Sequence, residues 1–200
     1  MSEYFDLLFL NDDEKGLFRV ICKDLKKKLK KDRYEHTLGV AYTAASLAMR
    51  YNFDINKALL AGLLHDSAKY MSSKEMYEKA LKHNVNISET EAKKPDLLHG
   101  KIGSYIAKHQ YKIEDCEILD SIIWHTTGRP EMTLLDKIIY VADYIEPKRY
   151  KMPRLNEIRQ KAFIDIDECL KMILEDSVNY LINSGMIIDD MTIKTYEYYK

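Results

Sequence analysis

The chain has 200 residues, of which 46% are hydrophobic and 32% charged, and its formal net charge is −1 at pH 7. This length fits one domain with a real core, and the nearly neutral balance excludes the strongly basic field of a bulk nucleic-acid binder. The nearly neutral net charge also does not favour binding to an anionic membrane surface. No hydrophobic run approaches the ~20 residues that a transmembrane helix needs.

The spacing of hydrophobic residues predicts helices throughout, and only seven glycines and four prolines interrupt the chain. The charge run 23–31 is interpreted as a solvated helix face with Leu25 and Leu29 turned inward, rather than as an anion site. Asp32 is predicted to cap the first helix of the main domain. Further helices are expected at 55–64, 72–82, 97–109, 114–125, 134–145, 165–185 and, as a last turn or two, 192–199. Residues 84–96 and 147–153 are expected to be loops.

The most informative local feature is the pair His65-Asp66, which directly follows the hydrophobic run 58–64. Adjacent residues on a helix point in different directions, so both side chains can face one ion only where the helix ends or loosens. Imidazole and carboxylate groups suit iron, manganese or zinc. Together with His36 and Asp143, the pair would supply four ligands from three helices. A six-coordinate metal would then keep two open positions, as catalytic sites do.

Asp143 strengthens this interpretation because it interrupts the hydrophobic run 138–145. A buried acid is costly unless it is paired or binds a metal. The alternative is a buried carboxylate that accepts hydrogen bonds from Tyr or Arg. Isolated histidines such as His83 and His109 are interpreted as surface or internally satisfied residues.

Two more histidines, His99 and His125, are each predicted near a helix end and are followed by small residues. Either one could bind a second metal, hydrogen-bond a phosphate or protonate a leaving group, and the sequence does not choose between them. Lys69 and Arg149 follow or flank the ligand-bearing segments, where their natural use is to neutralise phosphate charge.

Cys22, Cys116 and Cys169 are odd in number, widely spaced and form no CxxC motif. Reduced thiols in a cytoplasmic protein are the simplest interpretation. A homodimer stays open, since the charge pattern does not set the oligomeric state.

Five strings, in this order, resemble the YqeK family, a group of bacterial symmetrical diadenosine-tetraphosphate hydrolases in the HD-domain superfamily of metal-dependent phosphohydrolases. They are Arg33-x-x-His36-Thr37-Leu38-Gly39-Val40, Ala61-Gly62-Leu63-Leu64-His65-Asp66-x-Ala68-Lys69, Leu97-Leu98-His99-Gly100, Trp124-His125-Thr126-Thr127-Gly128 and Ala142-Asp143-Tyr144-Ile145-Glu146-Pro147-x-Arg149. After Arg149 the family tends towards Phe-Pro-Gly, whereas this chain continues Lys151-Met152-Pro153-Arg154.

The resemblance implies an all-α HD-domain helical bundle over residues 33–200. Residues 1–32 have no clear match and are interpreted as an N-terminal helical extension. The resemblance also implies iron as the cofactor, bound as one or two ions. Manganese, cobalt or zinc is compatible with the same ligands. The implied metal ligands are His36, His65, Asp66 and Asp143. The implied phosphate-binding residues are His36, Lys69, His99, His125, Thr127, Gly128 and Arg149.

The expected reaction is hydrolysis of diadenosine tetraphosphate to two molecules of ADP. Four residues are expected to be catalytic: Asp66 holds the attacking water, Lys69 stabilises charge on the phosphoryl oxygens, and His99 or His125 is the general acid. One alternative is an HD phosphohydrolase that acts on a nucleoside monophosphate, a deoxynucleotide or a cyclic dinucleotide. Another is a non-catalytic module that senses nucleotides.

Overall fold

The computed structural model describes residues 12–200, and residues 1–11 of the expected N-terminal extension lie outside this part. The described residues form helices and contain no strand, so the all-α prediction is confirmed. In chain order the elements are α1 (Asp12–Lys28), α2 (Lys31–Arg50), α3 (Ile55–Leu64), α4 (Ser73–Lys82), α5 (Glu89–Lys93), the 3₁₀ turn η1 (Pro95–Leu98), α6 (His99–Gln110), α7 (Cys116–Trp124), α8 (Leu134–Ile145), α9 (Leu155–Ala162), α10 (Ile166–Asn183) and α11 (Asp190–Tyr199).

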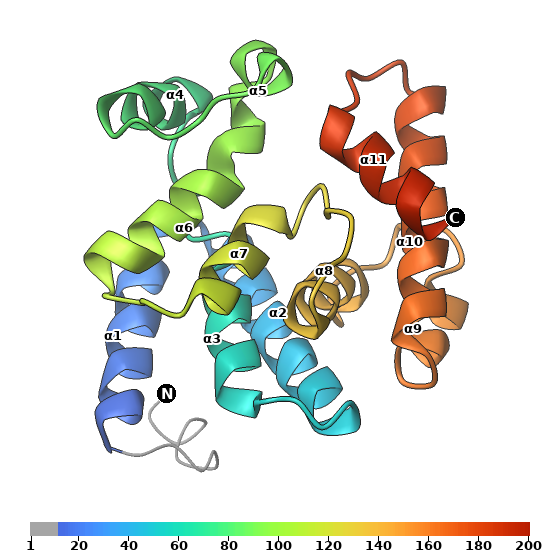
Figure 1. Ribbon diagram of the computed structural model, residues 1–200. Coiled ribbons are helices and arrows are strands. Elements are labelled where there is room, and N and C mark those ends of the chain that lie inside the picture. The colour runs from blue at the N-terminus through green and yellow to red at the C-terminus, as the bar shows by residue number, and fades with distance from the viewer. Residues whose placement is uncertain (1–11) are drawn as a thin grey trace.

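The centre of the fold is the pair α2 and α3, against which α7 and α8 pack (Figure 1). The two central helices approach closely because Gly62 on α3 meets the backbone of α2. A Cβ atom at Gly62 would lie only 2.7 Å from the Cα atom of Ala41. Fully buried side chains such as Leu47, Leu59 and Ile138 fill the space between these helices. Each buried aliphatic side chain of this size contributes about 2 kcal/mol through the hydrophobic effect.

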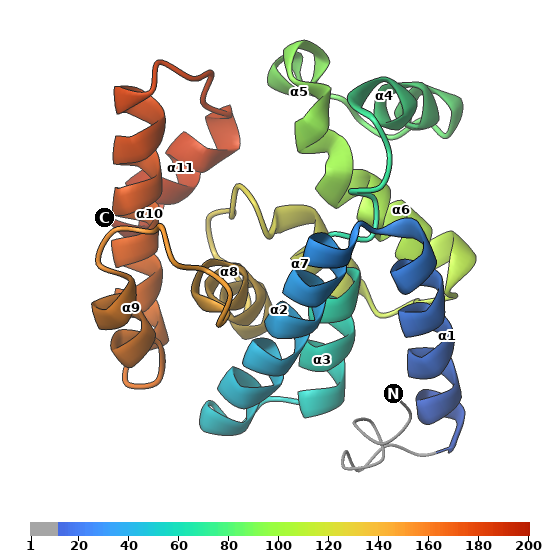
Figure 2. The same cartoon turned by 180° about the vertical axis from the view of Figure 1, so that it is seen from behind.

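The remaining helices surround this centre on different sides. In both views α1 lies at one edge of the molecule and α9, α10 and α11 lie at the opposite edge (Figures 1 and 2). Helix α10 packs on α8, α9 and α11, and α6 packs on α7. No helix within residues 12–200 has both the length and the hydrophobicity to cross a membrane.

Several helix boundaries agree with the sequence analysis, and the reason is their capping chemistry. Helices α3 and α8 have the predicted bounds. The capping boxes that begin at Ser72 and Thr133 are both present, with reciprocal side-chain and backbone hydrogen bonds. Such boxes satisfy backbone N–H groups that a helix N-terminus leaves without partners, which makes them reliable start signals.

Other local predictions are wrong. Asp32 is not an N-cap: the N-cap of α2 is Lys30, two residues earlier, and it makes no side-chain capping bond. Asp32 instead lies in the first turn, where a negative charge favours the helix dipole. Residues 84–96 are not simply a loop, because a third capping box, from Ser88 to Glu91, begins the short helix α5. Helix α9 was not predicted.

The described part of the N-terminal extension packs against the main domain. Phe18, Ile21 and Leu25 of α1 are buried in the common hydrophobic core, and the inward orientation predicted for Leu25 and Leu29 is confirmed. The boundary between residues 32 and 33 stays a proposal.

Asp24 of α1 forms a polar contact between this helix and the end of α6. Its carboxylate accepts hydrogen bonds from Lys28, from the hydroxyl of Tyr111 and from Gln110, the last at 2.6 Å. Burial raises the pKa of Asp24, but these hydrogen bonds outweigh it and hold the pKa below its ordinary value of 3.8.

We therefore expect Asp24→Asn to lower the free energy of unfolding by about 1–2 kcal/mol at pH 7. Because the pKa of Asp24 is lowered in the folded state, its contribution is present above pH 3.8 and is lost as the pH falls through the lowered pKa. Urea denaturation at pH 7 and near pH 3 should show the difference from wild type shrinking at acid pH. Glu78→Gln, which removes an exposed pair with Lys74, is the control and should cost less than about 0.5 kcal/mol at either pH. A pH-independent difference for Asp24→Asn would contradict the prediction.

Candidate metal centre

The end of α3 lets His65 and Asp66 face the same point. His65 is the C-cap residue of α3, and the chain leaves helical geometry in the turn that follows. The His65 ring donates its Nδ1–H to the carbonyl oxygen of Gly62 at 2.7 Å, because a carbonyl can only accept. Its Nε2 atom therefore presents a lone pair, and the whole side chain is buried. The expectation that a helix end allows both side chains to converge is confirmed.

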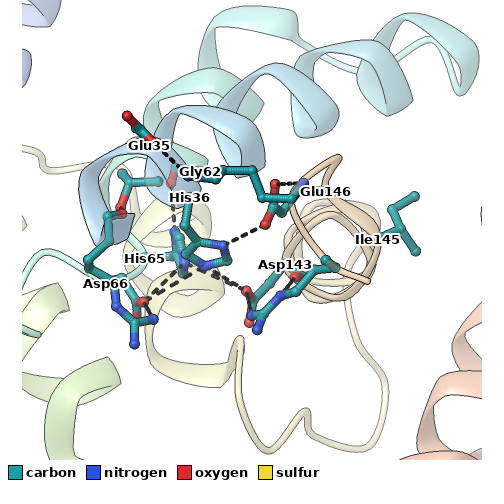
Figure 3. A network of polar contacts seen from close by, with 12 residues as sticks. Glu35, His36, Gly62, His65, Asp66, Asp143, Ile145 and Glu146 are labelled. Atoms are coloured by element: carbon teal, nitrogen blue, oxygen red, sulfur yellow. Dashed lines mark hydrogen bonds and ion pairs between the residues drawn. The ribbon is translucent and has the colours of Figure 1, made fainter. Parts of the chain in front are cut away.

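Four side chains predicted as ligands converge on this point (Figure 3). The Nε2 atom of His36 lies 3.1 Å from Oδ1 of Asp143 and 3.9 Å from Oδ2 of Asp66. The Nε2 atom of His65 lies 3.6 Å from Oδ2 of Asp66 and 3.9 Å from Oδ1 of Asp143. Both Nε2 atoms are buried and make no hydrogen bond within the described residues. Two unpartnered imidazole nitrogens beside two carboxylates form a donor set that fits a divalent cation.

Glu146 is a functional residue to which the sequence analysis gave no role. Its side chain is buried, and Oε1 accepts the Nδ1–H of His36 at 3.0 Å. Gly39 leaves the space for this contact, since a Cβ atom there would lie 2.5 Å from Oε2. The other oxygen accepts the backbone N–H of Lys148 at 2.7 Å. A carboxylate in this position directs the Nε2 lone pair of His36 towards the ligand cluster and strengthens it as a ligand.

The second oxygen of Asp66 faces a second pair of histidines. Oδ1 lies 3.6 Å from Nε2 of His99 and 3.6 Å from Nε2 of His125. Each of these rings donates Nδ1–H to a backbone carbonyl at 2.7 Å, and their Nε2 atoms are 3.0 Å apart. Two lone pairs at this separation repel each other, so a shared proton or a cation is needed to favour the arrangement. Asp66 is thus placed between the two groups of histidines.

Burial keeps two of these rings neutral. It lowers the pKa of His65 to about 4 and that of His99 to about 3. Burial acts in the opposite direction on Asp66, but His65, His125 and His99 outweigh it and hold the pKa of Asp66 well below its usual range. Neutral imidazoles beside an ionised carboxylate are the protonation states that metal binding requires.

Three cations surround the ligands. Arg33 pairs with Asp66 at 2.7 Å, and Arg149 pairs with Asp143 at 2.7 Å while also donating to its backbone carbonyl at 2.9 Å. The backbone N–H of Lys69 donates to the carbonyl of Asp66 at 3.0 Å, whereas its ammonium group makes no hydrogen bond or ion pair with the described residues, and burial lowers its pKa. The sequence analysis named Lys69 and Arg149 but gave Arg33 no role, although its position three residues before His36 was a usable signal.

Two predicted phosphate-binding residues lie elsewhere. Gly128 has a φ of +65°, and a Cβ atom there would be 2.6 Å from Cγ2 of Thr195 on α11. Its backbone N–H closes the end of α7 by donating to Trp124 at 2.8 Å. Thr127 lines a separate cavity of about 430 Å³ and donates to the Gly128 carbonyl. The structure therefore places this pair in a helix-terminating turn and not among the convergent ligands.

A cavity of about 560 Å³ opens beside the cluster, between α8, α10 and the α8–α9 connection. Tyr140, Tyr144 and Tyr180 line it, and Asp143 and His125 connect it to the ligands. We call it the tyrosine cavity. Its size is that of a small-molecule site, and aromatic walls beside a polar end suit a nucleoside attached to phosphate.

A family model described as "HD domain" matches residues 33–148, which include all four convergent ligands. The chain belongs to the HD-domain family. The recognition made from the sequence is confirmed. We refer to the cluster of His36, His65, Asp66 and Asp143, which lies within the matched residues, as the HD site.

Among HD relatives, the chain is similar to proteins named "Bis(5'-nucleosyl)-tetraphosphatase, symmetrical". The Bacillus subtilis protein is 36% identical over 174 residues, which cover 87% of this chain and 92% of the relative. The Staphylococcus aureus protein is 38% identical over 176 residues, covering 87% and 90%. A crystal structure from Clostridium acetobutylicum, described as a predicted HD superfamily hydrolase involved in NAD metabolism, superposes with a TM-score of 0.88 at 37% identity. That match covers 91% of this chain and 96% of the other.

The contact between Glu146 and His36 can be tested by metal binding. Glu146→Gln should weaken the HD site about 10–100-fold for metal, because an amide is a poorer acceptor for the Nδ1–H of His36. Gly39→Ala should do the same by displacing the Glu146 carboxylate. Metal affinity is measured by competition with a chromophoric chelator, and elemental analysis of anaerobically purified protein identifies the ion.

Gly16→Ala is the matched control, since a Cβ atom at Gly16 meets nothing within 4 Å. It should leave metal affinity unchanged. Wild-type affinity in both Glu146→Gln and Gly39→Ala would show that His36 does not depend on this contact.

Proposed function

We propose that the protein is a metal-dependent hydrolase that cleaves diadenosine tetraphosphate symmetrically into two molecules of ADP. The observation that carries the proposal is the convergence of three buried side chains, His36, His65 and Asp66, and the half-buried Asp143 with three cations beside the tyrosine cavity. The similarity to symmetrical bis(5'-nucleosyl)-tetraphosphatases over most of the chain supports the choice of substrate.

The donor atoms support His36, His65, Asp66 and Asp143 as the ligands of one divalent ion, and we propose iron, with manganese, cobalt and zinc compatible with the same set. The position of Asp66 between the two groups of histidines supports a second ion held by His99 and His125. When bound, the metal would supply the Lewis acidity that activates water and polarises a phosphoryl oxygen.

The basic residues stabilise the charge of the polyphosphate. Arg33 and Arg149 hold carboxylates of the ligand cluster, so their guanidinium groups are already positioned at its rim. Lys69 is buried enough to be poorly hydrated and has its ammonium group free for a phosphate oxygen. Fixed positive charge of this kind dominates catalysis of phosphoryl transfer. The placement of Gly128 and Thr127 in a turn weakens their assignment to phosphate binding.

Asp66 is proposed to orient the attacking water, since its carboxylate lies at the centre of the cluster. With a single ion bound, so that its Nε2 atom is not a metal ligand, His125 is proposed as the proton donor to the departing ADP. His99 is less suited to that role, because its lowered pKa leaves the ring neutral and its Nε2 accepts a hydrogen bond from Thr126 at 3.0 Å.

We also propose a cytoplasmic location, which the three free cysteines support. The homodimer considered from the sequence stays a prediction.

Asp66→Asn tests the catalytic centre. We expect hydrolysis of diadenosine tetraphosphate to fall more than about 100-fold with saturating metal, a larger loss than an outer partner of a ligand would cause. Asp120→Asn removes an exposed carboxylate that pairs with Arg129, and it should retain activity. Chromatography of the wild-type products should show ADP alone. Formation of ATP with AMP would contradict a central cut, and residual activity within a few-fold of wild type in Asp66→Asn would contradict the mechanism.

Arg149→Gln tests the stabilisation of phosphate charge. Loss of one fixed cation at the reacting phosphates should reduce kcat about 100-fold, measured at saturating metal so that the change at Asp143 does not limit occupancy. Arg154→Gln is the control, because Arg154 pairs with Glu175 and Asp176 of α10 and not with the ligand cluster. Equal activities of the two variants would refute the role of Arg149.

A further inference from the structure

A further cavity, of about 530 Å³, borders the ligand cluster at His36. It lies between the first turns of α2 and the α8–α9 connection, and His36 is part of its wall. Arg33, Lys148 and Arg149 also line it, together with Tyr150. We call it the cationic cavity. Its wall has four basic side chains, from Arg33, Lys148, Arg149 and Lys151, two acidic ones, from Asp32 and Glu146, and one tyrosine. The tyrosine cavity has only two of these basic side chains, Arg149 and Lys151, and three tyrosines.

The segment 149–152 separates the two cavities, since Arg149, Lys151 and Met152 line both of them. Each cavity contacts the cluster through a different ligand: Asp143 on the tyrosine side and His36 on the cationic side. These two ligands are only 3.1 Å apart, from Nε2 to Oδ1. The HD site therefore lies where the two cavities meet, and a linear molecule that crosses it must place its two ends on opposite sides of this segment.

Tyr150 is the conspicuous feature of the cationic side. Its side chain is 78% exposed, the largest fraction among the exposed large hydrophobic residues of the described chain. The Nζ atom of Lys151 lies 5.3 Å from the centre of its ring. An aromatic ring kept at the surface beside basic groups is the arrangement on which a nucleobase stacks while its phosphates meet the cations. Packing does not explain the ring, because it contributes almost nothing to the core.

We propose that the cationic cavity is the subsite for the second nucleoside diphosphate unit of a dinucleoside polyphosphate, with its base stacked on Tyr150. The first unit occupies the tyrosine cavity, and the polyphosphate passes over Arg149, which borders both cavities. This inference rests on the proposed function. It accounts for a cut that leaves two equal halves, since a subsite on each side of the HD site centres the phosphate chain on it.

The test compares two substrates that differ only in the second nucleoside: diadenosine tetraphosphate and adenosine 5'-tetraphosphate. Both are assayed with metal-replete wild type, Tyr150→Ala and Tyr150→Phe. Tyr150→Ala should lower kcat/KM for the dinucleotide about tenfold relative to the mononucleotide, mainly through KM. Tyr150→Phe keeps the ring and should retain the wild-type ratio. Tyr198→Ala, which removes an exposed tyrosine of α11, controls for the loss of an aromatic side chain and should also retain it.

The outcomes separate the two levels of the proposal. An unchanged substrate ratio in Tyr150→Ala, or an equal loss for both substrates, would overturn the second subsite and leave the proposed function intact. Failure of the wild-type protein to cleave diadenosine tetraphosphate would overturn the proposed function, and the subsite with it. Thermal unfolding of each variant by circular dichroism should match wild type, because Tyr150 is exposed, and a lowered Tm would show that the ring is structural.

Discussion

The structure depends on one unfavourable convergence: two imidazole lone pairs and two carboxylates meet at a buried point and have no internal partner that satisfies them all. The Nε2 atoms of His36 and His65 lack hydrogen bonds within the described chain, although both are buried. Their other nitrogens are committed, one to Glu146 and one to the carbonyl of Gly62. This fixes the tautomers so that only a proton or a cation can satisfy the cluster.

The helices hold the two imidazoles and the two carboxylates together despite the free-energy cost of leaving their polar atoms without partners. Ligands come from α2, from the end of α3 and from α8, and the close approach of α2 and α3 at Gly62 leaves little freedom for them to separate. The buried leucines and alanines of these helices supply the packing that offsets the cost of the unpartnered lone pairs and the charges. The same helices supply the polar side chains of the site and hold them rigidly in place. Side chains on loops could move until their polar atoms formed hydrogen bonds with one another.

The sequence alone predicts which four side chains converge because their signals are local. A histidine and an aspartate after a hydrophobic helix, and an acid inside another, are costly patterns that a metal site explains. Glu146 is different: its role follows from a contact with a residue 110 positions away, which periodicity does not reveal. Gly128 is the opposite case, because a small residue beside a histidine also has a local explanation, a left-handed turn that ends α7 and packs against Thr195. Its role in phosphate binding stays a prediction.

The charges explain why the metal and the anionic substrate depend on each other. Asp66, Asp143 and Glu146 bring three negative charges to the site, and Arg33, Arg149 and Lys69 bring three positive ones. The site without an ion is therefore close to neutral and has little attraction for a polyphosphate. A divalent ion held by His36, His65, Asp66 and Asp143 would add two positive charges, and its attraction for the two carboxylates would leave Arg33 and Arg149 available to phosphate oxygens. One ion would thus satisfy the orphaned lone pairs, create the field that attracts the substrate and free the side chains that bind it.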